Sequence, residues 1–441
     1  MSIEPMKIAV LGAGLTGLEL GRKLGELGED FIILEKEPQV GGLCRTNKTG
    51  EYYWDFAVHA IYSRSKEAMD FFNSLPLEYQ HSDRNVKIFI FGKSKKRYCI
   101  EYPFENGVRE LPLKEKLECV LGYLAGRITK RKANNLEEWI DNSLGFGIAK
   151  YFMVPYNSKI WNCNLSDISL DLVSAKIEPA SAIKFIKSVF WEKTVGRKYQ
   201  SKFIYPRKGI QALCDYITKD IKNNIRLCSS VERLTRQGSK WTIAVSDGGV
   251  FEADMIISTI PLVELLKKVD ISGIEKEYKE LKWNNTFFIM VGLKKGSKFN
   301  LINDCHWVFF KGDEIFYRIT LMHNFSNEFL PTLVAEVTEK GDILDKTKDE
   351  IKNAVVKDLL RIGILGSLNE IAETDIKRVG YTYAIPSVGL NDIKIKIKNL
   401  LEKHNLFLVG RNGNWDYINM DGVYLKVRDS LPEILKKVAH P

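Results

Sequence analysis

The amino-terminal residues space their apolar side chains in two ways. Residues 8–11 form a short continuous apolar run, leucines recur at the helical spacing after a glycine-rich turn, and a second apolar run ends at Glu35. Short continuous runs are typical of buried strands, and a 3.6-residue period is typical of an amphipathic helix. The pattern predicts a strand, a turn, a helix and a second strand.

The glycines of this turn fit the GxGxxG pattern through Gly12, Gly14 and Gly17. The first permits a tight turn, the second lets the backbone approach a pyrophosphate, and the third lets helix and strand pack closely. The amino-terminal amides of the helix then face the phosphates. Glu35 stands at the position from which a carboxylate accepts hydrogen bonds from a ribose. The unit therefore predicts dinucleotide binding.

Further apolar patterns outline the rest of the chain. Residues 111–128 and 136–156 have helical spacing with charged opposite faces, and Pro155 is expected to end the second helix because it has no amide to donate. Residues 231–262 alternate like a β-meander and end in an apolar strand. From residue 418 the chain reads as a turn that opens a helix, whose first amides could face an anionic group.

Residues 151–161, YFMVPYNSKIW, place four aromatic rings beside an asparagine and a lysine. Aromatic rings bury large areas and dominate most cores, but they also stack on flat ligands. The pattern by itself leaves both interpretations open.

Composition narrows the class of protein. The hydrophobic fraction is 45% and the charged fraction 27%, as in soluble globular proteins. The seven cysteines are never spaced as CxxC, so neither a disulfide framework nor a zinc site is indicated. The net charge of +9 would suit an anionic ligand, although much of it lies in lysine-rich runs such as 92–97. With no signal peptide, long apolar run or nucleic-acid module, we expect a soluble cytoplasmic protein without metal, membrane span or nucleic-acid partner.

Several motifs carry a resemblance to a known family. EKEPQVGGLCRT, with Gly41, Gly42 and Arg45, resembles the extended FAD signature of the amine oxidase and UDP-galactopyranose mutase superfamily. Further segments resemble the eukaryotic-type branch of UDP-galactopyranose mutase, in the same order along the chain. They are YPFEN (102–106), LEEWIDNSLGFGIAKYFMVPYNSKIW (136–161), KFIYPRKG (202–209), FYRITLMHNFS (316–326) and GRNGNWDYINMD (410–421).

The resemblance implies an α/β fold with a discontinuous Rossmann-type FAD-binding domain, a helical insertion domain and an antiparallel β-sheet substrate domain. The FAD-binding parts are expected at 1–75, 196–262 and 386–441, the β-sheet substrate region at 76–110 and 263–385, and the helical insertion at 111–195.

The resemblance also implies an isomerase that interconverts the pyranose and furanose rings of a nucleotide sugar. In such enzymes N5 of reduced flavin attacks the anomeric carbon, and the nucleoside diphosphate leaves and later returns. NAD(P)H is the expected reductant, and it would use the substrate cleft because the chain has a single dinucleotide motif.

Site residues follow from the matching motifs. The expected catalytic residues are Arg318, Arg411 and His59, of which the arginines would hold the diphosphate. The expected cofactor-binding residues are Gly12, Gly14, Gly17, Glu35, Gly41, Gly42, Arg45, Val231, Gly410, Asn419, Met420 and Asp421. The expected substrate-binding residues are Tyr102, Phe152, Asn157, Trp161, Lys176 and Tyr417, with uracil against the aromatic rings and Tyr151 and Tyr156 left in the core.

The chain departs from the mutase pattern at several of these motifs. Ala57 and Val58 replace a glycine pair expected beside the flavin, which restricts backbone movement there. Lys176 replaces an arginine, Phe309 a tyrosine and Glu105 a glutamine, the last adding negative charge near the sugar. These changes predict a divergent member whose sugar need not be galactose.

Two other functions stay open. The shared FAD scaffold also suits an oxidase or desaturase of the amine oxidase or protoporphyrinogen oxidase type. A flavin-binding sensor or scaffold without turnover is the third interpretation, and a diphosphate clamp argues against it. The nucleotide base, the sugar and the oligomeric state are not specified by the sequence.

Overall fold

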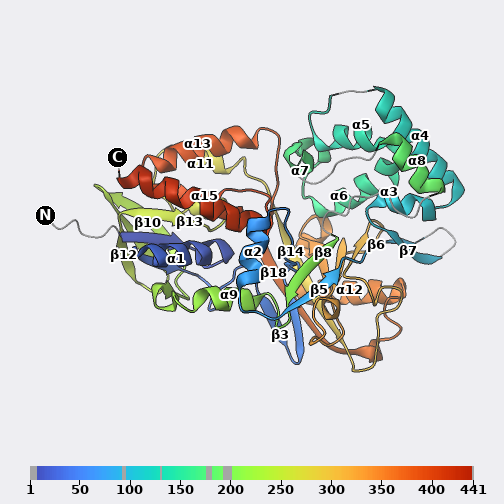
Figure 1. The fold of residues 1–441 in the computed structure, drawn as a ribbon, viewed down its shortest axis with the longest axis horizontal. Coiled ribbons are helices and arrows are strands. Elements are labelled where there is room, and N and C mark those ends of the chain that lie inside the picture. The colour runs from blue at the N-terminus through green and yellow to red at the C-terminus, as the bar shows by residue number, and fades with distance from the viewer. Residues whose placement is uncertain (1–6, 92–95, 130–131, 175–180, 192–200, 440–441) are drawn as a thin grey trace.

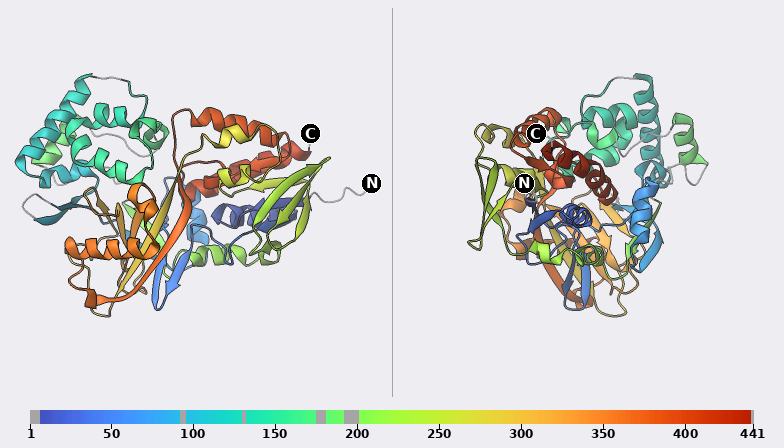
Figure 2. Two further views of the ribbon diagram at one scale, coloured as in Figure 1. Left: turned by 180° about the vertical axis from the view of Figure 1, so that it is seen from behind. Right: turned by 60° about the vertical axis from the view of Figure 1, so that its left-hand side comes forward.

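The computed structural model describes residues 7–91, 96–129, 132–174, 181–191 and 201–439. Two large β-sheets lie side by side, and a group of helices stands beyond the second sheet (Figure 1). The carboxyl end of α15 (Met420–Ala439) lies at the end of the molecule away from these helices, as the views in Figure 2 also show. The predicted α/β class, with one parallel sheet and a largely antiparallel one, is confirmed.

The first sheet is parallel and is assembled from three distant parts of the chain. Its strand order is β19-β13-β1-β2-β9. The strands are β1 (Lys7–Leu11), β2 (Asp30–Leu34), β9 (Ile225–Arg226), β13 (Met255–Ser258) and β19 (Leu406–Leu408). The predicted strand–turn–helix–strand unit is therefore present, and the apolar strand that closes the meander joins the same sheet.

Side chains of β1 alternate between two cores. Ile8 and Val10 face the helices α1 (Leu15–Leu27), α9 (Gln211–Thr218) and α15 (Met420–Ala439). Ala9 and Leu11 face the predicted meander, which is the antiparallel sheet of β10 (Val231–Gln237), β11 (Lys240–Val245) and β12 (Val250–Ala253). Both faces of a parallel sheet are thus covered, as its continuous apolar strands require.

The second sheet has seven strands in the order β18-β14-β17-β16-β15-β6-β7. All neighbours are antiparallel except the parallel pair β15 and β6. The strands are β6 (Val86–Phe91), β7 (Arg97–Glu101), β14 (Trp283–Leu293), β15 (Trp307–Phe310), β16 (Arg318–Leu321), β17 (Thr332–Thr338) and β18 (Ile371–Ala384). Helix α12 (Lys348–Arg361) packs its apolar side chains into the core of this sheet.

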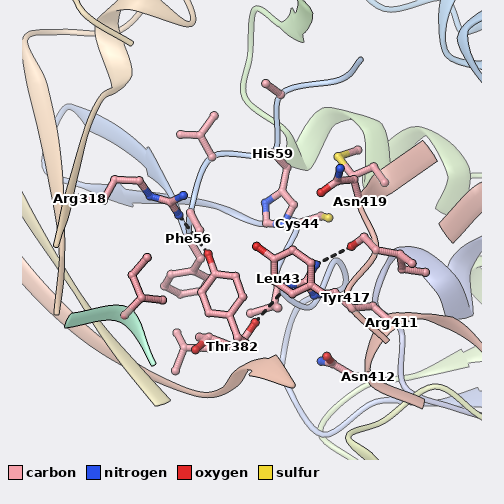
Figure 3. A pocket seen from close by; sticks show the side chains of 18 of the residues that line it. Leu43, Cys44, Phe56, His59, Arg318, Thr382, Arg411, Asn412, Tyr417 and Asn419 are labelled. Atoms are coloured by element: carbon pink, nitrogen blue, oxygen red, sulfur yellow. Dashed lines mark hydrogen bonds between the residues drawn. The ribbon is translucent and has the colours of Figure 1, made fainter. Parts of the chain in front are cut away.

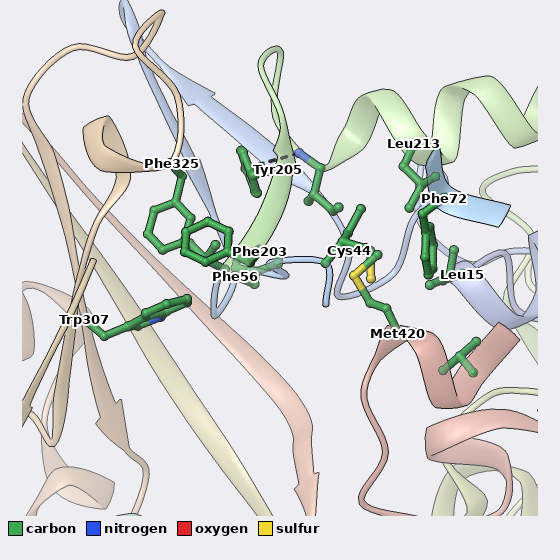
Figure 4. Close-up of a cluster of buried hydrophobic side chains, with 14 of the residues drawn as sticks. Leu15, Cys44, Phe56, Phe72, Phe203, Tyr205, Leu213, Trp307, Phe325 and Met420 are labelled. Atoms are coloured by element: carbon green, nitrogen blue, oxygen red, sulfur yellow. Dashed lines mark hydrogen bonds between the residues drawn. The ribbon is translucent and has the colours of Figure 1, made fainter. Parts of the chain in front are cut away.

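Shorter elements connect the two sheets. They are the paired strands β3 (Thr46–Thr49) with β4 (Tyr52–Asp55) and β5 (Tyr79–Asp83) with β8 (Lys202–Pro206), and the helices α2 (Lys66–Ser74), α10 (Leu262–Leu266), α11 (Glu275–Tyr278), α13 (Leu390–Glu402) and α14 (Gly410–Gly413). One hydrophobic core runs between the sheets. Figure 4 shows Cys44 and Met420 in its middle, with Phe72 toward α1 and Trp307 and Phe325 toward the second sheet.

The helical group comprises α3 (Phe104–Gly107), α4 (Leu113–Thr129), α5 (Leu136–Ile148), α6 (Val154–Ile160), α7 (Asp171–Ser174) and α8 (Ala182–Phe190). Helices α4 and α5 are the two amphipathic helices that the pattern predicts. They cross closely, because a Cβ atom on Gly145 would lie 2.1 Å from the backbone of Gly122.

The prediction that Pro155 ends the helical stretch is wrong. A single π-helical turn over Ala149–Met153 joins α5 to α6, and Pro155 lies in the first turn of α6. A proline is tolerated there because the first amides of a helix have no intrahelical acceptor. The helical stretch therefore continues to Ile160 and carries Asn157 with it.

The packing of the glycine-rich turn gives a test of the fold. A Cβ atom on Gly17 would lie 1.9 Å from the carbonyl oxygen of Gly12, which belongs to the backbone and cannot rotate away. We expect Gly17→Ala to lower the free energy of unfolding by about 1–3 kcal/mol or more, measured by urea denaturation.

Gly25→Ala is the matched control on the same helix. The nearest atom to its added Cβ is a methyl carbon of Ile221 at 3.5 Å, an ordinary contact. Because alanine is the better helix former by roughly 0.8–1 kcal/mol, this variant should be as stable as wild type or more stable. Equal loss of stability in both variants would contradict the proposed close approach.

Candidate functional site

One large cavity lies where the two sheets and the helical group meet. Its volume is about 1990 Å³, and its lining runs from Gly12 on the first sheet to Trp161 at the end of α6. Pockets for one small ligand usually measure roughly 300–1,000 Å³. The cavity is therefore large enough for two ligands side by side, such as a cofactor and a substrate.

The end of the cavity at the first sheet is organised around Glu35. This buried carboxylate accepts hydrogen bonds from the amides of Ala13 at 2.7 Å and Glu37 at 2.9 Å. Two carboxylate oxygens offer about four acceptor positions, so capacity remains for ligand hydroxyls. The glycine turn and the strand that ends beside it are thereby held in one geometry, as a dinucleotide site requires.

Most of the predicted cofactor residues line this end of the cavity. They are Gly12, Gly14, Glu35, Gly41, Gly42, Arg45, Val231, Asn419 and Met420. Gly17, Gly410 and Asp421 do not line the cavity, so their contact with the cofactor stays a prediction. Gly17 and Gly410 leave room for close packing, because added Cβ atoms would meet Gly12 and Thr16, and Asp421 accepts a hydrogen bond from Ser63 at 2.6 Å.

Two buried nitrogen atoms support the fit of this end of the cavity to flavin adenine dinucleotide (FAD). Nε of Arg45 and Nδ1 of His59 have no hydrogen-bond partner among the described residues. Such groups are costly unless a ligand or water satisfies them. Together with the glycine turn and Glu35, they make this end of the cavity suitable for FAD.

His59 lies in the loop after β4 and lines the cavity (Figure 3). Burial, together with the positive charges of Arg411 and Arg318, lowers its pKa to about 3. The imidazole is therefore neutral in the folded protein. The preceding Ala57 has a left-handed φ of 43°, and Val58 is buried, so side chains restrain this loop.

Arg318 extends from β16 and is held by a carboxylate. Glu336 lies opposite on β17, is fully buried, and accepts hydrogen bonds of 2.7 Å from Nε and from Nη2 of Arg318. Tyr317 donates to the same carboxylate at 2.7 Å, and Nη2 also donates to the hydroxyl of Tyr383 at 3.1 Å. Nη1 has no hydrogen-bond partner within the described residues, so it is the donor left for a ligand.

Arg411 lies on α14 and has a different environment. Its Nη1 donates to the carbonyl of Ile418 at 2.5 Å and its Nη2 to that of Thr382 at 3.5 Å. The guanidinium lies 4.8 Å from the ring centre of Tyr417 and 5.4 Å from that of Tyr383. No described carboxylate pairs with Arg411, so its positive charge is available to an anion. Figure 3 shows Arg318 and Arg411 reaching the cavity from different elements, with Tyr417 and His59 between them.

The aromatic stretch 151–161 is partly core and partly cavity wall. Phe152 is 2% exposed and stacks on both Phe104 and Tyr156, with ring centres 5.1 and 5.0 Å away. This ring offers little face to a nucleobase, which weakens the predicted stacking role of Phe152. Tyr156, expected in the core, lines the cavity beside Phe309.

Other predicted substrate residues meet near the arginines. Tyr102, Asn157, Trp161 and Tyr417 all line the cavity. The indole of Trp161 donates to Oδ1 of Asn157 at 3.2 Å and packs edge-on against Tyr417. Lys176 lies outside the described residues.

Sequence analysis missed two cavity residues. Tyr383 contacts both arginines from the end of β18, and Arg84 lies 5.5 Å from the ring centre of Tyr102 and 5.4 Å from that of Trp307. The pairing of β18 with β14 is irregular just before Tyr383, and Tyr381 has a left-handed φ of 53°, so nothing in the sequence shows which side chains meet the cavity. Arg84 belongs to no motif.

Within the described residues, no three or more histidine, cysteine, aspartate or glutamate side chains are grouped so as to hold a metal ion. None of the helices in this same part of the chain combines the length and the apolar character needed to cross a membrane.

Comparison with known proteins identifies related folds. Residues 15–425 match a family model described as flavin containing amine oxidoreductase. The structure of reduced UDP-galactopyranose mutase matches with a TM-score of 0.88 and 23% identity, covering 99% of this chain and 96% of that one. A putrescine oxidase variant matches with a TM-score of 0.69 and 14% identity, covering 98% and 99%. At these identities the likeness is one of fold.

Curated relatives match over shorter segments. The L-amino-acid oxidase of Crotalus adamanteus is 22% identical over 231 residues, which is 51% of this chain and 43% of that protein. The chain spans about half or less of the length of the curated relatives that it matches.

The neutral state of His59 gives a pH-dependent prediction. The ordinary pKa is 6.5 and the folded pKa about 3, so below pH 6.5 the unfolded chain binds a proton that the folded protein does not. We expect wild type to lose roughly 2 kcal/mol of unfolding free energy relative to His59→Asn between about pH 7 and pH 5. Urea denaturation of both proteins at both pH values measures this difference. A difference that stays constant with pH would contradict a neutral, buried imidazole.

Proposed function

Because the chain belongs to the family of flavin-containing amine oxidoreductases, we propose that it is a flavin-dependent mutase that interconverts the pyranose and furanose forms of a nucleotide sugar. The observation that carries this proposal is the convergence of Arg318 and Arg411 on the part of the cavity next to His59. Two guanidinium groups beside aromatic rings suit a nucleoside diphosphate, which is both anionic and flat at its base.

The two arginines would have different tasks. Glu336 holds Arg318 through two parallel hydrogen bonds, so the direction of its remaining Nη1 donor is set before a ligand arrives. Arg411 is held only by carbonyl groups and rings, so its charge is not compensated by a described acid. Arg318 would therefore orient the diphosphate, and Arg411 would supply most of the attraction for it as negative charge develops on departure.

FAD would be held by the glycine turn, Glu35, Arg45 and the residues before α15. When bound in reduced form, it supplies the nucleophile for the anomeric carbon. His59, being neutral, would add no charge beside the ring system and could donate or accept one hydrogen bond there. NAD(P)H is the proposed reductant, and it would use the substrate part of the same cavity.

An oxidase is the second candidate, and the loop beside His59 favours it. Ala57 and Val58 carry side chains at a point where the mutase resemblance implies glycines, and Val58 is buried. A restrained loop suits an oxidase, in which the substrate reduces the flavin and oxygen reoxidises it. It suits a mutase less well, if the mutase depends on movement of this loop. The two candidates differ in whether the substrate loses electrons.

Removal of Arg411 tests the proposed diphosphate clamp. The guanidinium has no described acidic partner, so Arg411→Ala leaves no buried carboxylate unpaired. We expect at least about a tenfold loss of UDP affinity and loss of turnover, with FAD still bound, measured by isothermal titration and flavin absorbance. Arg233→Ala is the control, because Arg233 is exposed and pairs with Asp270 at 2.8 Å. This variant should keep the UDP affinity of wild type.

Arg318 needs a compensated variant. Arg318→Ala alone would leave the buried carboxylate of Glu336 unpaired, which costs roughly 3–5 kcal/mol. The double variant Arg318→Ala with Glu336→Gln removes that charge and should fold while losing UDP affinity. If this double variant and Arg411→Ala both bind UDP as tightly as wild type does, the two arginines do not bind the diphosphate.

The reaction is tested directly under anaerobic conditions. FAD-loaded protein is incubated with UDP-, GDP- and dTDP-sugars, with and without dithionite, and the products are separated by chromatography and mass. A mutase gives a new product of unchanged mass with reduced flavin only. Bleaching of oxidised flavin by a substrate, with recovery in oxygen, would instead establish the oxidase.

A further inference from the structure

Glu105 places a carboxyl group in the substrate part of the cavity. It lies on α3, next to Phe104, whose ring stacks on Phe152 in the helical group. Glu105 itself lines the cavity. The residue is partly buried, and burial raises the pKa of its carboxyl group, while a hydrogen bond from its own backbone amide lowers it.

Four other carboxylates line the same cavity, and each has a partner. Glu35 accepts two backbone amides, Glu37 and Glu101 pair with Arg45 and Lys87, and Glu264 accepts from Tyr381 and pairs with Lys267 at 3.2 Å. Glu105 has no ion pair or side-chain donor among the described residues. A carboxylate offers about four acceptor positions, and Glu105 uses its own backbone amide as a donor, so acceptor capacity remains for a ligand group.

The position of Glu105 relates it to the arginines. The ring of Tyr102, three residues before Glu105, packs against Phe309 with ring centres 4.9 Å apart, and Phe309 pairs with Arg318 across β15 and β16. The segment that carries Glu105 therefore adjoins the strand that carries Arg318. A ligand whose diphosphate meets the arginines would bring its sugar toward Tyr102 and Glu105.

We propose that Glu105 is a specificity-determining residue that binds a protonated amino group on the sugar, so that the preferred ligand is a nucleotide amino sugar. The inference rests on the proposed function. An ammonium group would supply both the charge and the donors that Glu105 lacks, whereas a hydroxyl would supply a single donor. The glutamine that the mutase resemblance implies at this position is neutral and would give no such preference.

Binding to the full-length FAD-loaded protein tests this proposal. Isothermal titration compares UDP, UDP-galactose, UDP-galactosamine and UDP-N-acetylgalactosamine, the last of which keeps the nitrogen without its charge. Wild type should bind the free amine about tenfold or more tightly than the hydroxyl and N-acetyl sugars, as expected for a hydrogen bond between charged groups. Glu105→Gln should remove this preference and leave UDP affinity unchanged.

Glu101→Gln is the matched control, because Glu101 lines the cavity but already pairs with Lys87. This variant should keep the preference for the amine. If wild type binds UDP but does not distinguish the three sugars, the role of Glu105 is overturned while the diphosphate site stands. If wild type does not bind UDP, the proposed function itself fails. The wild-type comparison does not depend on whether Glu105→Gln folds.

Discussion

The ion pair between Arg318 and Glu336 is the interaction on which the geometry of the site depends. The two residues face each other across adjacent antiparallel strands, and the carboxylate is fully buried. A shift of one residue in strand register would turn one partner to the other face of the sheet and leave a buried charge unpaired. The pairing of β16 with β17 and the direction of the guanidinium are therefore set by one constraint.

Arg318 and Arg411 differ in what surrounds them, and this difference separates what each can offer a ligand. Glu336 neutralises Arg318, whereas carbonyl groups and the faces of Tyr383 and Tyr417 surround Arg411 without cancelling its charge. His59 contributes no charge because both arginines and burial keep it neutral. Arg411 thus offers a positive charge without a described acidic partner, and Arg318 offers a hydrogen-bond donor of fixed direction.

The sequence predicted the local elements better than the contacts between distant ones. Continuous apolar runs and helical spacing located β1, α1, α4 and most of α5, because these signals depend on neighbouring residues only. The parallel pairing of β6 with β15 joins segments more than two hundred residues apart and leaves no local signal. Tyr383 was missed for the same reason, because its position in the cavity depends on the pairing of β18 with the distant strand β14.

The aromatic stretch shows the same limit within the predicted site. Its rings could be recognised, but their partners could not, and Phe104 and Tyr156 both stack on Phe152. Pro155 was misread because its effect depends on whether a new helical segment begins there. The motif matches located Arg318, Arg411 and Tyr417 in one cavity because each lies in a segment with its own recognisable pattern.

The discontinuous first sheet has a consequence for synthesis of the protein. Its edge strand β19 comes from residues 406–408, and Arg411 and α15 follow still later. A growing chain can form the helical group and the seven-stranded sheet before it contains these residues, but its first sheet lacks an edge strand and its cavity lacks a wall. Domains generally fold as units during translation. Here the cofactor domain can close only after residues 406–439 have been made, so flavin binding must follow synthesis of the helical group and the seven-stranded sheet.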